Sequence, residues 1–308
     1  MFRNLTMFRF SQAVADDLAR LERALATNEL RACGALELST RGFVTPFGPA
    51  SSGNLTHRVG DCVLFTLGSE EKILPAAVVN QALADKVRAI AAEEDRRVGG
   101  RERKRLKADL LDTMLPRAFV RRSNLNGYVD LANGWLVVDT ATRSRAELVV
   151  SALREALGSF PALPLAPERP VRQYLTDSLF CGVPAGDFSP AWALGDECEL
   201  RDPASPHGSR WRGRNADLHG EEVKEHLRNG MQAFQLGLTF DDRLSFVLGE
   251  DMAIRKFRLL DVVLDELDTS NAETAADELS ARFALLTLEV QRLLQSLDAI
   301  FGLPRPAD

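Results

Sequence analysis

The residues whose types and spacing could do chemistry are basic, and they fall into three groups. The first reads RRVGGRERKRLK at 96–107, the second is LPRAFVRR at 115–122, and the third is RWRGR at 210–214. Guanidinium and ammonium groups gain free energy when they release the counterions of a phosphate chain. An aromatic ring among them, as in the second and third groups, can stack on an exposed base. The chemistry they indicate is the binding of a polyanion.

These groups stand out because the 308-residue chain carries a formal net charge of -6. Such a chain is not coated with cations, so a polyanion site has to be local. Taken singly, each group is more simply a set of solvated charges, which flank a core aromatic in the second and third groups. Taken together, the three favour polyanion binding. The candidate side chains are Arg96, Arg97, Arg101, Arg103, Lys104, Arg105 and Lys107 in the first group, Arg117, Phe119, Arg121 and Arg122 in the second, and Arg212 and Arg214 in the third.

Other kinds of site find little support in the sequence. The chain has no glycine-rich loop ending in GK[ST], no GxGxxG turn and no GxSxG elbow. Its four cysteines form no CxxC pair and its four histidines lack ligand spacing, so we expect no structural metal and no cofactor. The carboxylates Asp261, Asp265, Glu266 and Asp268 could form a two-metal nuclease site. Their spacing fits a solvated helix face better, because apolar residues interleave with them.

The hydrophobic pattern predicts the elements that must position the basic groups. A strand at 5–10 leads into a helix, and CVLFTL at 62–67 reads as a further strand. After Pro75 two helical stretches flank the Gly99-Gly100 break, which predicts a helical hairpin at 76–115 with a basic tip. No stretch is apolar enough to span a bilayer, and no signal peptide is evident, so we expect a cytosolic protein.

The second half of the chain predicts hairpins and a long helix. Asn133-Gly134 favours a tight turn between two β-prone runs, and residues 241–243 form a similar turn within 235–251. A helix is expected at 254–267, and apolar residues from Leu279 to Ile300 step by four and three along a last helix. Hairpins imply antiparallel pairing, so the fold class is α+β. We expect a central α+β subdomain at 1–75 and 116–165, the hairpin at 76–115, and a second α+β subdomain at 166–308.

Six blocks of the sequence resemble the RdgC family of bacterial recombination-associated proteins, in family order. They are FRNLTMFRFS at 2–11, EEKILPAAVVNQAL at 70–83, LLDTMLPRAFVR at 110–121, NGWLVVDTA at 133–141, LREALGSFPALPL at 153–165 and LTFDDRLSFVL at 238–248. The resemblance covers almost the whole chain.

The resemblance implies an α+β protomer that pairs into a ring-shaped homodimer. Double-stranded DNA would pass through a positively charged hole without sequence preference, and the protein would not be an enzyme. The resemblance further implies that the protein restrains RecA-promoted strand exchange during recombination and replication-fork repair, in the cytoplasm and at the nucleoid. A negative exterior with a positive lining would explain the local basic groups.

The resemblance also implies roles for individual residues. Arg117 and Phe119 match positions tied to DNA binding and to the dimer, and Lys72 matches the lysine of EEKILP. Arg214 keeps a family charge, whereas Asn215 and Ala216 depart from the family pattern. Gln235 likewise stands where a relative has lysine. Whether Phe119 contacts DNA or closes the dimer stays open, as does whether the basic tip meets DNA or the partner subunit.

Two alternatives to a DNA-binding ring remain. One is a metal-dependent DNA-processing enzyme that uses the carboxylates at 261–268. The other is a scaffold that binds protein and not DNA. The sequence contains no Asn- or Gln-rich recognition helix, so any DNA binding should be directed at the backbone.

Overall fold

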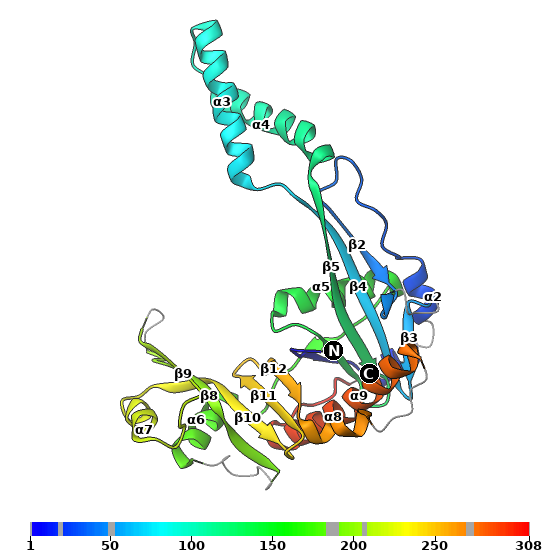
Figure 1. The fold of residues 1–308 in the computed structure, drawn as a ribbon, viewed down its shortest axis with the longest axis vertical. Helices are drawn as coiled ribbons and strands as arrows, with labels where there is room; N and C mark the ends of the chain where they lie inside the picture. The colour runs from blue at the N-terminus through cyan, green and yellow to red at the C-terminus, as the bar shows by residue number, and fades with distance from the viewer. Residues whose placement is uncertain are drawn as a thin grey trace. The chain divides into compact units, whose positions relative to one another are not determined.

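A computed structural model describes residues 2–17, 21–48, 53–182, 191–204, 208–268 and 274–307 (Figure 1). The fold is α+β with two sheets whose assigned strand pairings are antiparallel, which confirms the expected class. A bilayer would require about twenty apolar residues in one helix. None of the helices in the described part of the chain meets that requirement.

The first sheet has seven strands in the order β2-β4-β5-β6-β1-β7, with β3 paired to β4. Its strands are β1 Thr6–Arg9, β2 Ser39–Val44, β3 Thr56–Val59, β4 Cys62–Ile73, β5 Phe119–Asp130, β6 Trp135–Val138 and β7 Leu163–Pro164. The hairpin expected at Asn133-Gly134 joins β5 to β6. Gly134 has φ +70°, and an added Cβ would lie 2.5 Å from the Phe10 carbonyl oxygen, so only glycine fits this turn.

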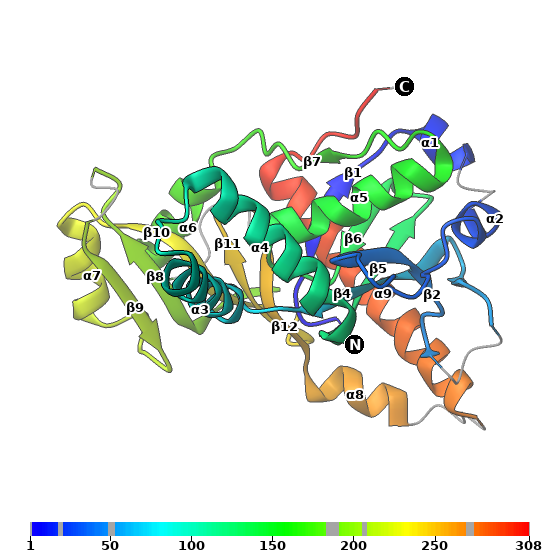
Figure 2. The same ribbon diagram turned by 90° about the horizontal axis from the view of Figure 1, so that it is seen from above.

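The second sheet has five strands in the order β12-β11-β10-β8-β9. They are β8 Trp192–Arg201, β9 Arg210–Arg214, β10 Gln232–Phe240, β11 Leu244–Gly249 and β12 Ile254–Leu259. Asp241 and Asp242 both have positive φ, as a tight hairpin turn requires, and they join β10 to β11 as expected. The helices α6 Val171–Cys181 and α7 Glu221–Arg228 lie beside this sheet in both views (Figures 1 and 2).

The expectation of a helix at 254–267 is wrong for the first half of that range. Residues 254–259 form β12, and only Asp261–Asp268 are helical, as α8. Ile254, Phe257 and Leu259 are buried against the core, and a bulge at Lys256, with φ +52°, brings all three to the same side. Short apolar runs do not distinguish a bulged strand from a helix.

The long C-terminal helix is confirmed as α9, Ala275–Phe301. Its N-terminus is a capping box, in which Thr274 accepts a hydrogen bond from the Asp277 amide and Asp277 accepts one from the Thr274 amide. The apolar stripe of this helix is buried in the core that the five-stranded sheet shares with α6 and α7. The helix is therefore a packing element of the core.

Contacts divide the chain into two compact units. The first comprises Met1–Thr27, Thr45–Thr66 and Leu125–Asp308, and it contains the five-stranded sheet, α1 Gln12–Asp17, α2 Leu21–Ala26, α5 Arg143–Leu157 and α9. The second comprises Asn28–Val44 and Leu67–Asn124. The division into 1–75 with 116–165, 76–115 and 166–308 that composition suggested stays a prediction.

The helical hairpin expected at 76–115 lies in the second unit. It consists of α3 Ala76–Glu94 and α4 Gly100–Met114, which pack side by side, followed by a 3-10 turn, η3, at Leu115–Arg117 (Figures 1 and 2). Only Val79 and Leu83 of α3 are fully buried, and no residue of α4 is. Such a thin apolar seam leaves most of the surface of both helices free for charge.

Candidate nucleic-acid interface

The open face of the five-stranded sheet carries a cluster of basic side chains. We call it the sheet patch and define it by Arg201, Arg210, Arg212, Arg214, Arg255, Lys256 and Arg258. Side chains alternate between the two faces along a strand, so Arg210, Arg212 and Arg214 of β9 all point to this face. All three are exposed. Arg201 pairs with Arg210 across the neighbouring strand, so arginines of β8 and β9 lie next to each other.

A buried carboxylate holds part of the sheet patch together. Glu199 is only 1% exposed and accepts hydrogen bonds from Arg201 Nε at 2.6 Å and Arg212 Nε at 3.0 Å, while Arg210 Nε lies 3.3 Å away. Burial would raise the pKa of Glu199, but the hydrogen bonds from Arg212 and Arg201 outweigh it and leave the pKa below its ordinary value. One negative charge thus fixes three guanidinium groups.

Two adjoining hollows form the surface of the sheet patch. The larger, of about 230 Å³, is lined by Arg214, Lys256 and Arg258 beside the close backbone approach of Gly195 and Gly237. The smaller, of about 120 Å³, shares Arg214 and Lys256 with it. Lys256 pairs with Glu197, whereas no acidic group within the described residues lies in ion-pair distance of Arg214 or Arg258. These two exposed arginines are available to an anion.

The aromatic residue in RWRGR does not belong to the sheet patch. Trp211 points to the opposite side of β9, where its ring lies tilted against His226 with the ring centroids 5.3 Å apart. Its Nε1 donates to Glu222 at 3.0 Å. For this group the simpler interpretation holds: the aromatic anchors the strand, and the arginines alone face solvent.

The basic tip of the hairpin forms a second cationic surface, in the other unit. Arg96 is held by Glu94 and Glu102, whose hydrogen bonds raise its pKa, and Lys107 Nζ donates to Asn80. Five further tip residues are exposed and have no acidic partner among the described residues. They are Arg97, Arg101, Arg103, Lys104 and Arg105.

The segment 117–122 presents the remaining candidates from the same unit. Arg117 is exposed at the end of η3, and the Phe119 side chain is 83% exposed, a rare state for a large aromatic. Arg121 pairs with Glu71 and Arg122 with Glu70. Arg117 and Phe119 are therefore the members of this segment that are free to meet a ligand or a partner.

Lys72 differs from every other candidate. It is buried, 8% exposed, and its ammonium donates to the backbone carbonyls of Ala35 and Leu115. In this protomer the charge of Lys72 is directed into its own unit and away from solvent.

Several patch residues could not be found from the sequence. Arg201, Arg255, Lys256 and Arg258 lie far from RWRGR along the chain, and strand pairing alone brings them to the same face. The alternation of charge within RWRGR and within IRKFRL was the only available signal. No pattern in the sequence indicates the role of Glu199, because that role depends on the register of β8 against β9.

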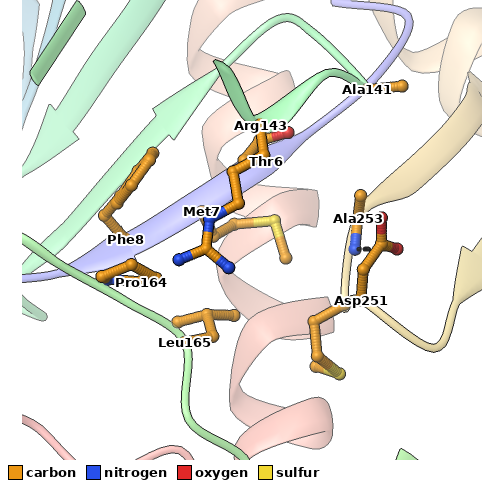
Figure 3. Close-up of a pocket in the computed structure, with 10 residues that line it drawn as sticks. Thr6, Met7, Phe8, Ala141, Arg143, Pro164, Leu165, Asp251 and Ala253 are labelled. Carbon is orange, nitrogen blue, oxygen red and sulfur yellow. Dashed lines mark hydrogen bonds between the residues drawn. The ribbon is translucent and has the colours of Figure 1, made fainter. Parts of the chain in front are cut away.

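The pocket nearest to an active-site arrangement among those formed by the described residues is small. It has a volume of about 50 Å³ and lies between β1 and the turn at 251–253. Arg143 points into it (Figure 3). Its one carboxylate, Asp251, is held by Arg255 at 2.7 Å. Within the described residues, no three side chains of His, Cys, Asp or Glu come together as metal ligands.

The acidic cluster at 261–268 is partly neutralised by arginines. Arg243 donates to Glu266 at 2.7 Å and to the buried Glu289 at 2.7 Å, and these bonds lower the pKa of Glu266 and raise that of Arg243. Glu289 is also paired with Arg292. Carboxylates engaged in this way brace α8 against α9.

Comparison with known proteins places the sequence in a family. Residues 1–303 match the family model described as "Putative exonuclease, RdgC". The chain belongs to the RdgC family. It is 46% identical over 298 residues to the recombination-associated protein RdgC of Xanthomonas campestris pv. campestris strain B100, with 96% of each chain covered. The RdgC proteins of Xanthomonas oryzae pv. oryzae strain MAFF 311018 and Xylella fastidiosa strain 9a5c are each 44% identical, over 99% and 96% of each chain.

The hydrogen bonds of Glu199 should make the stability of the folded protein depend on pH. Because its pKa is depressed in the folded state, its contribution to stability is complete above the pKa of an unfolded glutamate, about 4.3, and is lost as the pH falls through the folded pKa. Glu199→Gln should therefore lower the free energy of unfolding at pH 7, and the gap from the wild type should shrink below about pH 4. Urea unfolding at several pH values measures both. A gap that is constant with pH would contradict this.

Proposed function

We propose that the protein binds double-stranded DNA without sequence preference and in this way restrains RecA-dependent recombination. The supporting observation is the sheet patch, where Arg214 and Arg258 are exposed and have no acidic partner among the described residues, in a chain whose net charge is negative. Its relatives bear the name recombination-associated protein, which agrees with this role. Arginine-rich surfaces suit the phosphate backbone, whereas base readout needs an element that enters a groove.

The cationic tip of the hairpin and the exposed pair Arg117 and Phe119 complete the proposal. We assign the tip residues and Arg117 to phosphate contact, and we assign Phe119 to either ring closure or DNA contact. Two protomers would form a closed ring at the nucleoid, with the sheet patch toward the duplex. Segregating the positive charge to the lining would keep the remaining surface acidic.

Removing Arg214 from the sheet patch should weaken the binding of all duplexes about equally. Each phosphate contact contributes about -0.9 to the slope of log K against log salt, so Arg214→Ala should make that slope shallower by up to about 0.9. The same variant should restrain RecA-promoted strand exchange less than the wild type does. Fluorescence anisotropy with two unrelated 30-bp duplexes, over a series of salt concentrations, measures the effect.

A matched control is Arg145→Ala, which removes an exposed arginine of α5 that lies outside the patch. This control should leave the slope unchanged. A flat salt dependence of the wild type would favour a protein scaffold, and a strong preference for one duplex sequence would contradict backbone binding.

A ring makes a separate prediction about assembly and topology. Sedimentation should give a particle of twice the 33.9 kDa chain mass. After loading at low salt, the protein should stay on nicked circular DNA at a salt concentration that releases it from a linear duplex of the same length, because only the linear molecule has ends. A monomer, or equal release from both DNAs, would rule out the ring.

The family description makes nuclease activity the second candidate function. We expect no cleavage when labelled duplex or single-stranded DNA is incubated with the protein and Mg²⁺ or Mn²⁺, since Glu266 of the 261–268 cluster is held by Arg243 and the described residues bring no three such ligands together. Metal-dependent cleavage that Asp265→Asn abolishes would establish the enzyme instead.

A further inference from the structure

The second unit contains two buried charges on the same strand face. Glu70 and Lys72 are two residues apart on β4, so both point to the same side, and they are 5% and 8% exposed. Their neighbours Glu71 and Ile73 point the other way and are exposed. Charged side chains are rarely buried unless bonds satisfy them, so the contacts of this pair reveal what it does.

Both buried charges bind backbone groups of other segments. Glu70 accepts a hydrogen bond from the Cys33 amide at 2.8 Å and another from Arg122 Nε at 2.8 Å. Lys72 donates through Nζ to the carbonyls of Ala35 and Leu115, the latter at 2.9 Å. The backbone amide of Lys72 donates to the Leu38 carbonyl oxygen at 2.8 Å. Together they tie the 33–38 segment and the end of α4 to the strand.

The Leu115 carbonyl lies at the turn that leads to the exposed residues Arg117 and Phe119. Leu115 follows the last residue of α4 and begins η3, the turn that carries Arg117 and leads to Phe119. Its carbonyl accepts a hydrogen bond from the Ala118 amide at 3.2 Å, and carbonyls at a helix C-terminus also favour a nearby cation. The ammonium of Lys72 supplies that cation from inside the unit, at the point where the chain turns from helix to strand.

We propose that Lys72 is a positioning residue, whose ammonium locks the turn at Leu115 and thereby presents Arg117 and Phe119, and that it does not itself contact DNA phosphate. This inference rests on the proposed function for its DNA readout and on the contacts of Lys72 for its structural part. The geometry suits an ammonium at this position. With methionine, the buried Leu115 carbonyl would keep only the Ala118 amide, 3.2 Å away, and the partly buried Ala35 carbonyl would lose its lysine donor. We expect the larger planar guanidinium of arginine to fit poorly between the two carbonyls.

A double-mutant cycle tests whether Lys72 acts through Arg117. Lys72→Met and Arg117→Ala should each reduce the salt slope by up to about 0.9, and the double variant should lose no more than Arg117→Ala alone. Lys72→Arg should resemble Lys72→Met, although it keeps the charge. Lys104→Met is the matched control, because it removes an exposed lysine from α4; whatever its effect, it should add to that of Arg117→Ala.

Hydrogen exchange of the full-length protein without DNA tests the lock itself. In Lys72→Met, exchange should accelerate at least about fivefold in peptides covering 33–38 and 115–122, because the loss of a charged donor from the Leu115 and Ala35 carbonyls destabilises the turn. Peptides of the five-stranded sheet should be unchanged, as should every peptide of Lys104→Met. This readout would still decide for or against the lock if the wild type bound no duplex and the proposed function failed.

The outcomes separate the two roles for Lys72. Additive losses in the double variant, or full binding by Lys72→Arg, would mean that Lys72 contacts phosphate directly, and the proposal would be wrong. Unchanged exchange in Lys72→Met would equally overturn it. Non-additive binding together with local acceleration of exchange would support it.

Discussion

Like charges on one face of a sheet repel one another, and the way this protein contains that repulsion determines its candidate interface. Arg201, Arg210 and Arg212 converge on the buried carboxylate of Glu199. A single negative charge among three positive ones leaves a net positive surface and fixes the directions of the guanidinium groups. Ordering these long side chains before a ligand arrives reduces the entropy lost on binding.

The second unit uses buried charge for a different purpose. Its apolar interior is small, since α4 buries no side chain completely and α3 buries two. Glu70 and Lys72 replace part of that interior with hydrogen bonds to backbone groups. Such bonds are directional, whereas apolar contacts are not, so they determine where a turn lies as well as whether it folds. The most exposed aromatic side chain among the described residues, Phe119, is two residues beyond this turn.

Arginine has two different roles in this protein, one near α8 and one on the sheet patch. Arg243 and Arg292 are occupied by Glu266, Glu289 and Asp241, so they stabilise the packing of α8 and α9. Arg214 and Arg258 have no such partners among the described residues. Counting basic residues along the chain cannot separate these classes, because what distinguishes them is the presence of a carboxylate within hydrogen-bonding distance.

The sequence by itself determined the α+β class, the helical hairpin with its basic tip, both β-hairpins and the long last helix, since each depends on local periodicity or on residues that favour a turn. Its family blocks led to RdgC, which the comparisons confirmed. Tertiary structure alone decided that 254–259 is a strand, that Trp211 faces the core side, that Lys72 is buried, and that Arg255 and Arg258 join RWRGR on one surface. These outcomes follow from strand register and from contacts between residues far apart in the chain, and neither is encoded in the spacing of neighbouring residues.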